Sequence, residues 1–198
     1  MLIGLDFDNT IVCYDRPIER LADKLLQLPS DLPRTKLAIR DYLREGNREQ
    51  EWTAFQGELY GPGMSYAQPF EHSVETMRAL KTAGHSLCIV SHRSLRPYAG
   101  PAYDLHAAAR AWIDKNLASD LIVNSQAFFY ETRDEKITAI GALECEIFLD
   151  DLPIVLGNEV FPNSCQPILF DPENFHAKVN CVRITNWNQL PVMFSGLQ

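Results

Sequence analysis

The sequence predicts an α/β protein built on a doubly wound, mostly parallel sheet, with a small helical insertion near its N-terminus. Short apolar runs, typical of strands buried on both faces, recur along the chain. Segments with helical spacing of apolar residues separate most of these runs, and alternating β and α units favour a parallel sheet. One long early stretch carries helical patterns alone, which indicates the insertion.

Five segments have the composition of buried strands. They are residues 2–5, 86–91, 120–124, 146–150 and 167–170. Helices between them are predicted from apolar residues three or four positions apart: Val74, Met77 and Leu80; Leu105, Ala109, Trp112 and Ile113; Ile137, Ile140 and Leu143. Gly84 follows the first helix where a C-terminal glycine belongs, and the acidic residues around Asp134 suit the start of the third.

The early stretch, residues 15–69, is divided by Pro29, Pro33 and Gly46 into three predicted helices. We therefore expect a Rossmann-like core made of residues 1–14 and 70–198, interrupted by a helical domain at 15–69.

Composition narrows the partners and the compartment. The net charge of -8 and the pI near 5.1 mean that the surface as a whole repels nucleic acid and anionic membrane. The five cysteines are scattered and form no CxxC pair, which favours reduced thiols. No apolar run approaches the roughly 18 residues of a membrane span, and no secretory signal is visible. We expect a cytoplasmic protein with neither nucleic acid nor membrane as a partner.

The first candidate functional residues lie in the segment LDFDNT. Strand alternation places Asp6 and Asp8 on one side at the carboxyl end of the first strand. Open α/β sheets bind ligands at that edge. A lone DxD pattern also occurs in ordinary turns, so further residues must decide between the two interpretations.

Three later features fall at the same edge: Ser91, Lys136 and the pair Asp150 and Asp151. Phosphoryl transfer spreads negative charge over three equatorial oxygens, and a hydroxyl, a cation and a metal ion around a carboxylate nucleophile would stabilise that charge. Magnesium prefers oxygen ligands such as carboxylates. The set therefore favours Mg²⁺-dependent phosphoryl transfer.

The order of these motifs is similar to that of the haloacid dehalogenase (HAD) superfamily. The chain has DxDxT at Asp6, Asp8 and Thr10, then Ser91 at a strand end, then Lys136, then LDDLP. This resemblance covers most of the chain, and the helical insertion resembles the cap domain of that superfamily.

The resemblance implies a role for each residue. Asp6 would be the nucleophile that forms an aspartyl-phosphate, and Asp8 the general acid and base. Ser91 would hold a phosphoryl oxygen, and Lys136 would neutralise charge on Asp6 and the phosphoryl group. Thr10, Ser91, His92 and Arg93 are candidate substrate-binding residues, although a surface-loop interpretation suits His92 and Arg93 equally well.

For Mg²⁺, the resemblance implies the set Asp6, Asp8, Asp150 and Asp151. Asp151 would bind the metal directly, together with Asp6 and the backbone carbonyl of Asp8. Asp150 would lie outside the direct ligands, but neighbouring carboxylates can exchange these roles.

The acid at Asp8 argues against a dehalogenase or a phosphonate hydrolase, because the resemblance implies that these lack an acid there. A phosphatase acting on a small phosphorylated metabolite is our choice over a phosphotransferase or phosphomutase, since hydrolysis is the commoner reaction. A signalling receiver disagrees in motif order, and a non-catalytic HAD-like binding module should have lost part of the set. Either an anion-binding face or a solvated helix surface explains the basic residues Arg34, Lys36, Arg40, Arg44 and Arg48. No oligomeric state is predicted.

Overall fold

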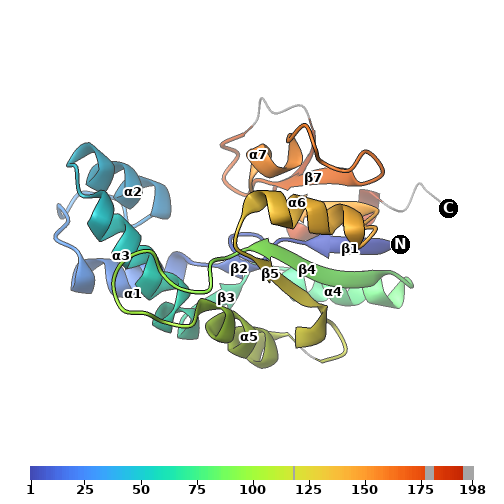
Figure 1. The fold of residues 1–198 in the computed structure, drawn as a ribbon, viewed down its shortest axis with the longest axis horizontal. Helices are drawn as coiled ribbons and strands as arrows, with labels where there is room; N and C mark the ends of the chain where they lie inside the picture. The colour runs from blue at the N-terminus through green and yellow to red at the C-terminus, as the bar shows by residue number, and fades with distance from the viewer. Residues whose placement is uncertain (118, 177–180, 194–198) are drawn as a thin grey trace. The chain divides into compact units, whose positions relative to one another are not determined.

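A computed structural model describes residues 1–117, 119–176 and 181–193 of the chain (Figure 1). The chain divides into two compact units. The first, here called the core unit, consists of Met1–Val12, Pro69–Arg93 and Ile113–Gln198. The second, the helical unit, consists of Cys13–Gln68 and Ser94–Trp112. Residues 94–112, which the sequence pattern assigns to the core, are grouped with the helices of the insertion.

The described part of the core unit contains a six-stranded sheet in the order β5-β4-β1-β6-β7-β8. Every pairing between neighbouring strands is parallel. The strands are β1 (Leu2–Leu5), β4 (Ser86–His92), β5 (Ala127–Tyr130), β6 (Ile147–Asp150), β7 (Gln166–Phe170) and β8 (Val182–Ile184). The order runs outward from β1 in both directions, so the sheet is doubly wound and the predicted fold class is confirmed.

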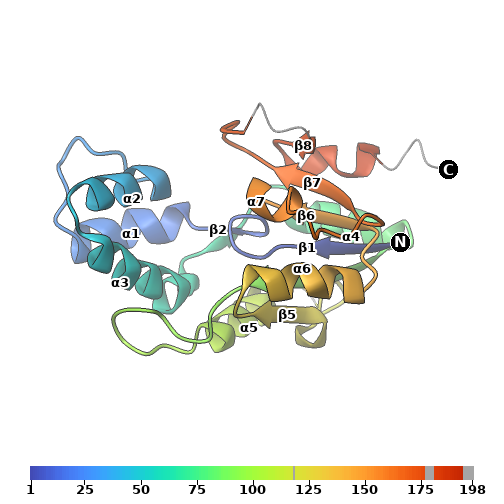
Figure 2. The same cartoon turned by 45° about the horizontal axis from the view of Figure 1, so that its top comes forward.

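The helices of the core unit lie in the connections between its strands. They are α4 (Ser73–Thr82), α6 (Arg133–Ala142) and α7 (Pro153–Leu156), while α5 (Leu105–Asn116) runs across the unit boundary. Connections between parallel strands are right-handed. The connection from β1 to β4 crosses the sheet toward its β5 edge, whereas the connection from β5 to β6 crosses it in the opposite direction. Helices α4 and α6 therefore cover opposite faces of the sheet (Figure 2). Short 3-10 turns complete the unit: η2 (Asn124–Gln126), η3 (Trp187–Gln189) and η4 (Pro191–Met193).

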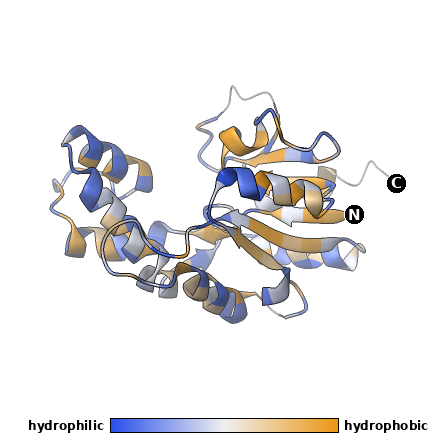
Figure 3. Ribbon diagram, viewed as in Figure 1, coloured by the Kyte–Doolittle hydropathy of each residue, from blue (hydrophilic) through white to orange (hydrophobic). Residues whose placement is uncertain are grey.

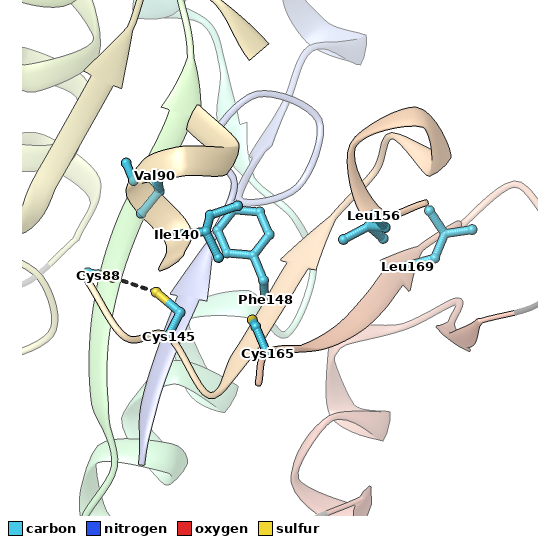
Figure 4. Close-up of a cluster of buried hydrophobic side chains, with 9 residues drawn as sticks. Cys88, Val90, Ile140, Cys145, Phe148, Leu156, Cys165 and Leu169 are labelled. Atoms are coloured by element: carbon cyan, nitrogen blue, oxygen red, sulfur yellow. Dashed lines mark hydrogen bonds between the residues drawn. The ribbon is translucent and has the colours of Figure 1, made fainter. Parts of the chain in front are cut away.

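Apolar strands make the core of this unit, as the hydropathy colouring shows (Figure 3). Phe148, Val90 and Ile140 pack together with Cys88 and Cys145, whose sulfur atoms lie 3.9 Å apart as free thiols (Figure 4). Gly4 in β1 permits this packing. A Cβ atom at Gly4 would come within 2.6 Å of the Phe148 ring and 2.9 Å of the Cys145 sulfur.

One predicted strand is wrong. Residues 120–124 consist of a turn, an irregular stretch and the first residue of η2, and the strand at that edge of the sheet is β5, a few residues further on. Leu121 and Ile122 are nonetheless buried, so their apolar character reflects packing in a loop. An apolar run alone does not separate a buried strand from another buried segment.

The helical unit contains α1 (Asp15–Leu25), α2 (Lys36–Glu45), α3 (Glu49–Tyr60) and the 3-10 turn η1 (Pro62–Ser65), which confirms the three predicted helices. Its interior includes Ile39, Leu43, Trp52 and Phe55. Two short strands, β2 (Val12–Cys13) and β3 (Gln68–Pro69), pair as a second sheet. Among residues 1–117, 119–176 and 181–193, no helix combines the length and the apolar character needed to cross a membrane.

Candidate active site

Asp6 lies at the carboxyl end of β1, in the middle of the sheet. Its backbone N–H donates to the Leu149 carbonyl at 2.8 Å, and only 4% of the residue is exposed. The chain then turns sharply, because Asn9 adopts a left-handed conformation with φ of 60°, which Asn tolerates better than most residues. This turn returns the Thr10 hydroxyl toward the Asp6 carboxylate, with Oγ1 3.4 Å from Oδ2.

A hydroxyl and an ammonium group converge on the same carboxylate. Ser91 is the second-to-last residue of β4, and its Oγ donates to Asp6 Oδ1 at 2.9 Å. Lys136, in the first turns of α6, donates from Nζ to Asp6 Oδ1 at 2.6 Å. The same Nζ lies 2.6 Å from Oδ2 of Asp150, the last residue of β6. Three strands and one helix thus bring these four side chains together.

Lys136 is held in place by the local sequence as well as by its carboxylate partners. Thr132 caps α6, accepting from the Glu135 N–H at 3.2 Å, and the Glu135 side chain accepts from the Thr132 N–H at 3.0 Å. This capping box fixes the first turn of the helix. The Lys136 side chain then runs inward, and it is 1% exposed.

Burial controls the charge state of this cluster. It raises the pKa of the Asp6 carboxyl to about 7, although Lys136 acts in the opposite direction. Burial alone would lower the pKa of Lys136, but the charges of Asp150 and Asp6 outweigh it, so that pKa is raised. Lys136 therefore carries a fixed positive charge between two carboxylates.

A group of carboxylates could hold a divalent cation. Asp6, Asp150 and Asp151 each offer an oxygen, and these oxygens lie within 4.8 Å of one another. Asp150 is fully buried and is engaged through both oxygens, since Oδ1 accepts from the Leu152 N–H at 2.9 Å. Asp151 is less buried than either partner. Such an oxygen set has the chemistry that Mg²⁺ prefers.

Asp8 has a different environment from Asp6. Its two carboxylate oxygens both accept from NH1 of Arg93, at 2.7 Å each. The neighbouring His92 directs its Nε2 to the Glu131 backbone carbonyl at 3.0 Å, and burial lowers the pKa of His92. Of the candidate substrate-binding residues, Thr10 and Ser91 thus contact Asp6, Arg93 contacts Asp8, and His92 contacts the backbone.

One residue of the site has no counterpart in the sequence analysis. Trp187 in η3 is fully buried, and its indole Nε1 donates to the Thr10 backbone carbonyl at 3.0 Å. The indole N–H of a buried tryptophan usually has a hydrogen-bond partner, so the sequence could suggest that Trp187 has one. The residues next to Trp187 in the sequence do not identify that partner.

Comparisons with known proteins agree with this architecture. No protein-family model matches the chain. A Bacillus cereus protein named "Putative nucleotidase" is 26% identical over 204 residues, and the match covers 96% of each protein. Among solved structures, a haloacid dehalogenase-like hydrolase from Streptococcus pneumoniae superposes with a TM-score of 0.61 at 11% identity, covering 98% of both chains. A HAD family hydrolase from Deinococcus radiodurans, solved with bound phosphate and sodium, has a TM-score of 0.59 at 14% identity and covers 98% of this chain and 95% of its own.

The chain therefore has the fold of the HAD-like hydrolases. The resemblance indicated by the ordered motifs is confirmed at the level of the fold.

Proposed function

We propose that this protein is a phosphatase that hydrolyses a phosphate monoester of a small metabolite, with Asp6 as the nucleophile. The observation that carries the proposal is the environment of Asp6. Its buried carboxylate, at the carboxyl edge of the sheet, is contacted by the Ser91 hydroxyl and the Lys136 ammonium group. A preorganised cation and hydroxyl would stabilise the charge that develops on a phosphoryl group in transfer.

In the first step, a carboxylate oxygen of Asp6 attacks phosphorus, and the bond between phosphorus and the ester oxygen breaks. The proton of the Asp8 carboxyl passes to that ester oxygen, so the alcohol leaves neutral. Asp6 then carries the phosphoryl group as a mixed anhydride, while Ser91 and Lys136 remain near its oxygens.

In the second step, the Asp8 carboxylate accepts a proton from a water molecule, whose oxygen attacks phosphorus. The bond between phosphorus and the Asp6 oxygen breaks, inorganic phosphate leaves, and both carboxyl groups return to their starting states. In the alternative reaction, phosphoryl transfer, a second hydroxyl group would replace that water molecule.

The metal assignment is part of the same proposal. Asp6 and Asp151 would be side-chain ligands of Mg²⁺, the Asp8 backbone carbonyl would complete the protein ligands, and Asp150 would hold Lys136 beside them. Mg²⁺ bound there would neutralise negative charge on the phosphoryl oxygens. Asp150, whose two oxygens already accept from Lys136 and the Leu152 N–H, suits an indirect role.

The Bacillus cereus relative suggests a substrate class. We propose nucleoside monophosphates as the first substrates to test, beside phosphorylated sugars, within the broader class of small phosphate monoesters. We also maintain the predictions of a cytoplasmic location and of no nucleic-acid or membrane partner.

A chromogenic aryl phosphate tests the proposal directly. With Mg²⁺, the wild-type protein should release phosphate from the aryl ester and from at least one member of a metabolite panel. Asp6→Asn should reduce this activity to background. Asp134→Asn makes the same change of charge at an exposed position of α6 and should retain wild-type activity. The proposal is wrong if the wild type is inactive on the whole panel or if Asp6→Asn keeps full activity.

A further inference from the structure

Arg93 is a buried cation that has no role in the two reaction steps proposed above. It follows directly after β4, only 3% of the residue is exposed, and its NH1 lies 2.7 Å from both oxygens of Asp8. Removing a guanidinium group from water carries a large free-energy cost unless a charged partner compensates for it. The Asp8 side chain is 16% exposed, compared with 2% for the side chain of Arg93.

Both the backbone and the side chain of Arg93 make contacts besides the one to Asp8. The Arg93 backbone N–H donates to the Tyr130 carbonyl at 2.8 Å, which continues the pairing of β4 with β5 by one residue. Its guanidinium carbon lies 5.8 Å from the centre of the Phe7 ring, within the range of a cation–π contact. Phe7 is itself fully buried against Phe129, with ring centres 5.7 Å apart. Arg93 therefore has a defined position from which it can restrain Asp8.

Asp8 is the residue that most needs such restraint. Asp6 is fixed by Ser91 and Lys136, whereas Asp8 lies beyond the end of β1, in the loop that turns at Asn9. In the proposed reaction, Asp8 gives a proton to the ester oxygen and later takes one from water. Proton transfer is fast only when the two oxygens are held within hydrogen-bonding distance and correctly aligned.

We infer that Arg93 is a positioning residue, which holds the Asp8 carboxylate in place for proton transfer, and that it does not serve to bind the substrate phosphate. This inference rests on the proposed function, in which Asp8 is the acid and base. Arg93 keeps all its protons in both steps, and no bond to it forms or breaks.

A double-mutant cycle separates positioning from substrate binding. We would measure kcat and KM for wild type, Arg93→Gln, Asp8→Asn and the double variant, with aryl phosphates whose leaving groups range from good to poor. Arg93→Gln should lower kcat about tenfold to a hundredfold, most for poor leaving groups, with KM within about threefold of wild type. In the Asp8→Asn background the same change should have almost no further effect on kcat. A rise in KM alone, or an equal loss in both backgrounds, overturns the inference.

Arg183 supplies a matched control. It also pairs with a buried carboxylate of the core unit, Asp171, at 3.0 Å. Arg183→Gln should leave the dependence on the leaving group unchanged, and its effects should add to those of Asp8→Asn. Arg93→Lys keeps the positive charge, so it should recover part of the kcat that Arg93→Gln loses. If Arg93→Gln does not fold, Arg93→Lys replaces it in the double-mutant cycle.

A second measurement does not depend on activity. Crystal structures of wild type and of the Arg93 variant should show the Asp8 side chain in a new orientation or without defined density in the variant. Asp6, Ser91 and Lys136 should keep their positions. An unchanged Asp8 overturns the inference even in an active enzyme. A wild type inactive on every ester would refute the proposed function separately, and the two structures would still decide whether Arg93 holds Asp8.

Discussion

Trp187 and Thr10 are joined by a hydrogen bond of 3.0 Å from the indole Nε1 to the backbone carbonyl oxygen, across 177 positions of sequence. The Trp187 carbonyl in turn accepts from the Thr76 hydroxyl at 3.2 Å, and its ring packs against Phe170. The loop that follows Asp8 is therefore tied to α4 and to the chain after β8. Part of the geometry around Asp6 thus depends on residues far from the motif that contains it.

We predict that Trp187→Phe affects both stability and turnover. The variant keeps an aromatic ring but leaves the buried Thr10 carbonyl without its donor, at a cost of about 1–3 kcal/mol in the free energy of unfolding. Since the loop carrying Asp8 loses a restraint, kcat should also fall several-fold. Urea unfolding and steady-state kinetics measure the two effects.

Trp112 provides the control, because its indole Nε1 donates to the Ala67 carbonyl at 3.0 Å within the helical unit. Trp112→Phe should cost a similar free energy of unfolding, with a smaller effect on the kcat for a small aryl phosphate. An equal loss of kcat in both variants would argue against a role for Trp187 in restraining the loop that follows Asp8.

Lys136 should be essential for stability as well as for turnover. It is buried between Asp6 and Asp150, so Lys136→Met leaves two carboxylates facing each other without a cation. Breaking a buried ion pair in this way commonly costs about 3–5 kcal/mol, and loss of a preorganised charge lowers turnover about a hundredfold or more.

The double variant Lys136→Met/Asp150→Asn distinguishes the two effects. Removing the second charge should restore part of the unfolding free energy, whereas kcat should stay low because the cation is still missing. Chemical unfolding and single-turnover assays measure the two quantities. Near-normal turnover by either folded variant contradicts the role proposed for Lys136.

The strands at the centre of the sheet could be predicted from sequence, because a strand buried on both faces is apolar at nearly every position. This criterion succeeded at β1, β4 and β6. It misplaced β5, since Leu121 and Ile122 are equally apolar but are buried in a loop. The short strand β8 was not predicted, because its three residues, which include Arg183, lack such a run.

The same distinction applies to the candidate site. Asp6, Ser91, Lys136 and Asp150 could be predicted as neighbours, because the ends of parallel strands meet at one edge. The partner of Asp8 could not, since Arg93 lies 85 positions away and its charge is equally compatible with an exposed loop. Only tertiary packing determines that this arginine is buried.

Magnesium removal should abolish activity. Exhaustive treatment with EDTA should reduce turnover to background, and Mg²⁺ should restore it, because the candidate ligands are carboxylates without a histidine or cysteine among them. Asp151→Asn should raise the Mg²⁺ concentration needed for half-maximal activity about tenfold or more, while Asp134→Asn should not change it. Activity that survives EDTA, or that zinc alone restores, contradicts the metal assignment.

Asp171 should make stability depend on pH. Its carboxylate accepts from the backbone N–H groups of Phe175 and His176, at 2.9 Å each, and from Arg183. Burial alone would raise the pKa of Asp171, but the hydrogen bonds from His176 and Arg183 outweigh it, and that pKa is lowered. The Asp171 carboxylate therefore binds a proton less readily in the folded state than in the unfolded state. The stabilisation that its charge gives the folded state is present above about pH 4 and is lost as the pH falls through the pKa of Asp171 in the folded state.

Asp171→Asn should therefore lower the free energy of unfolding by about 1–3 kcal/mol at pH 7. The difference from wild type should shrink as the pH falls below about 4, because the wild-type carboxyl is then protonated as well. Urea unfolding of both proteins at several pH values measures it. A difference that stays constant down to the acid limit of the folded state would show that the charge of Asp171 is not the cause.

The two aspartates of the first motif should give mutants with different chemistry. Asp6→Asn removes the nucleophile, so no covalent intermediate can form and activity should fall to background. Asp8→Asn keeps the nucleophile, but it cannot protonate the leaving oxygen or activate the water that resolves the intermediate. With an activated aryl phosphate, protonation of the leaving group matters less, so this variant should accumulate a phosphoryl group on Asp6 and release phosphate slowly.

Acid quenching followed by mass spectrometry of peptides locates that phosphoryl group in the wild type and in both variants. Asp8→Asn should be labelled at Asp6 to a higher level than the wild type, because formation of the intermediate survives while its hydrolysis is slowed. Asp6→Asn should carry no label, and its chain should give a normal unfolding transition, which separates loss of the nucleophile from loss of the fold. The different environments of the two carboxylates, one beside Lys136 and the other beside Arg93, are the structural reason to expect this division of labour. A label on Asp8 in any of the three proteins, or full hydrolysis by Asp6→Asn, would refute the mechanism.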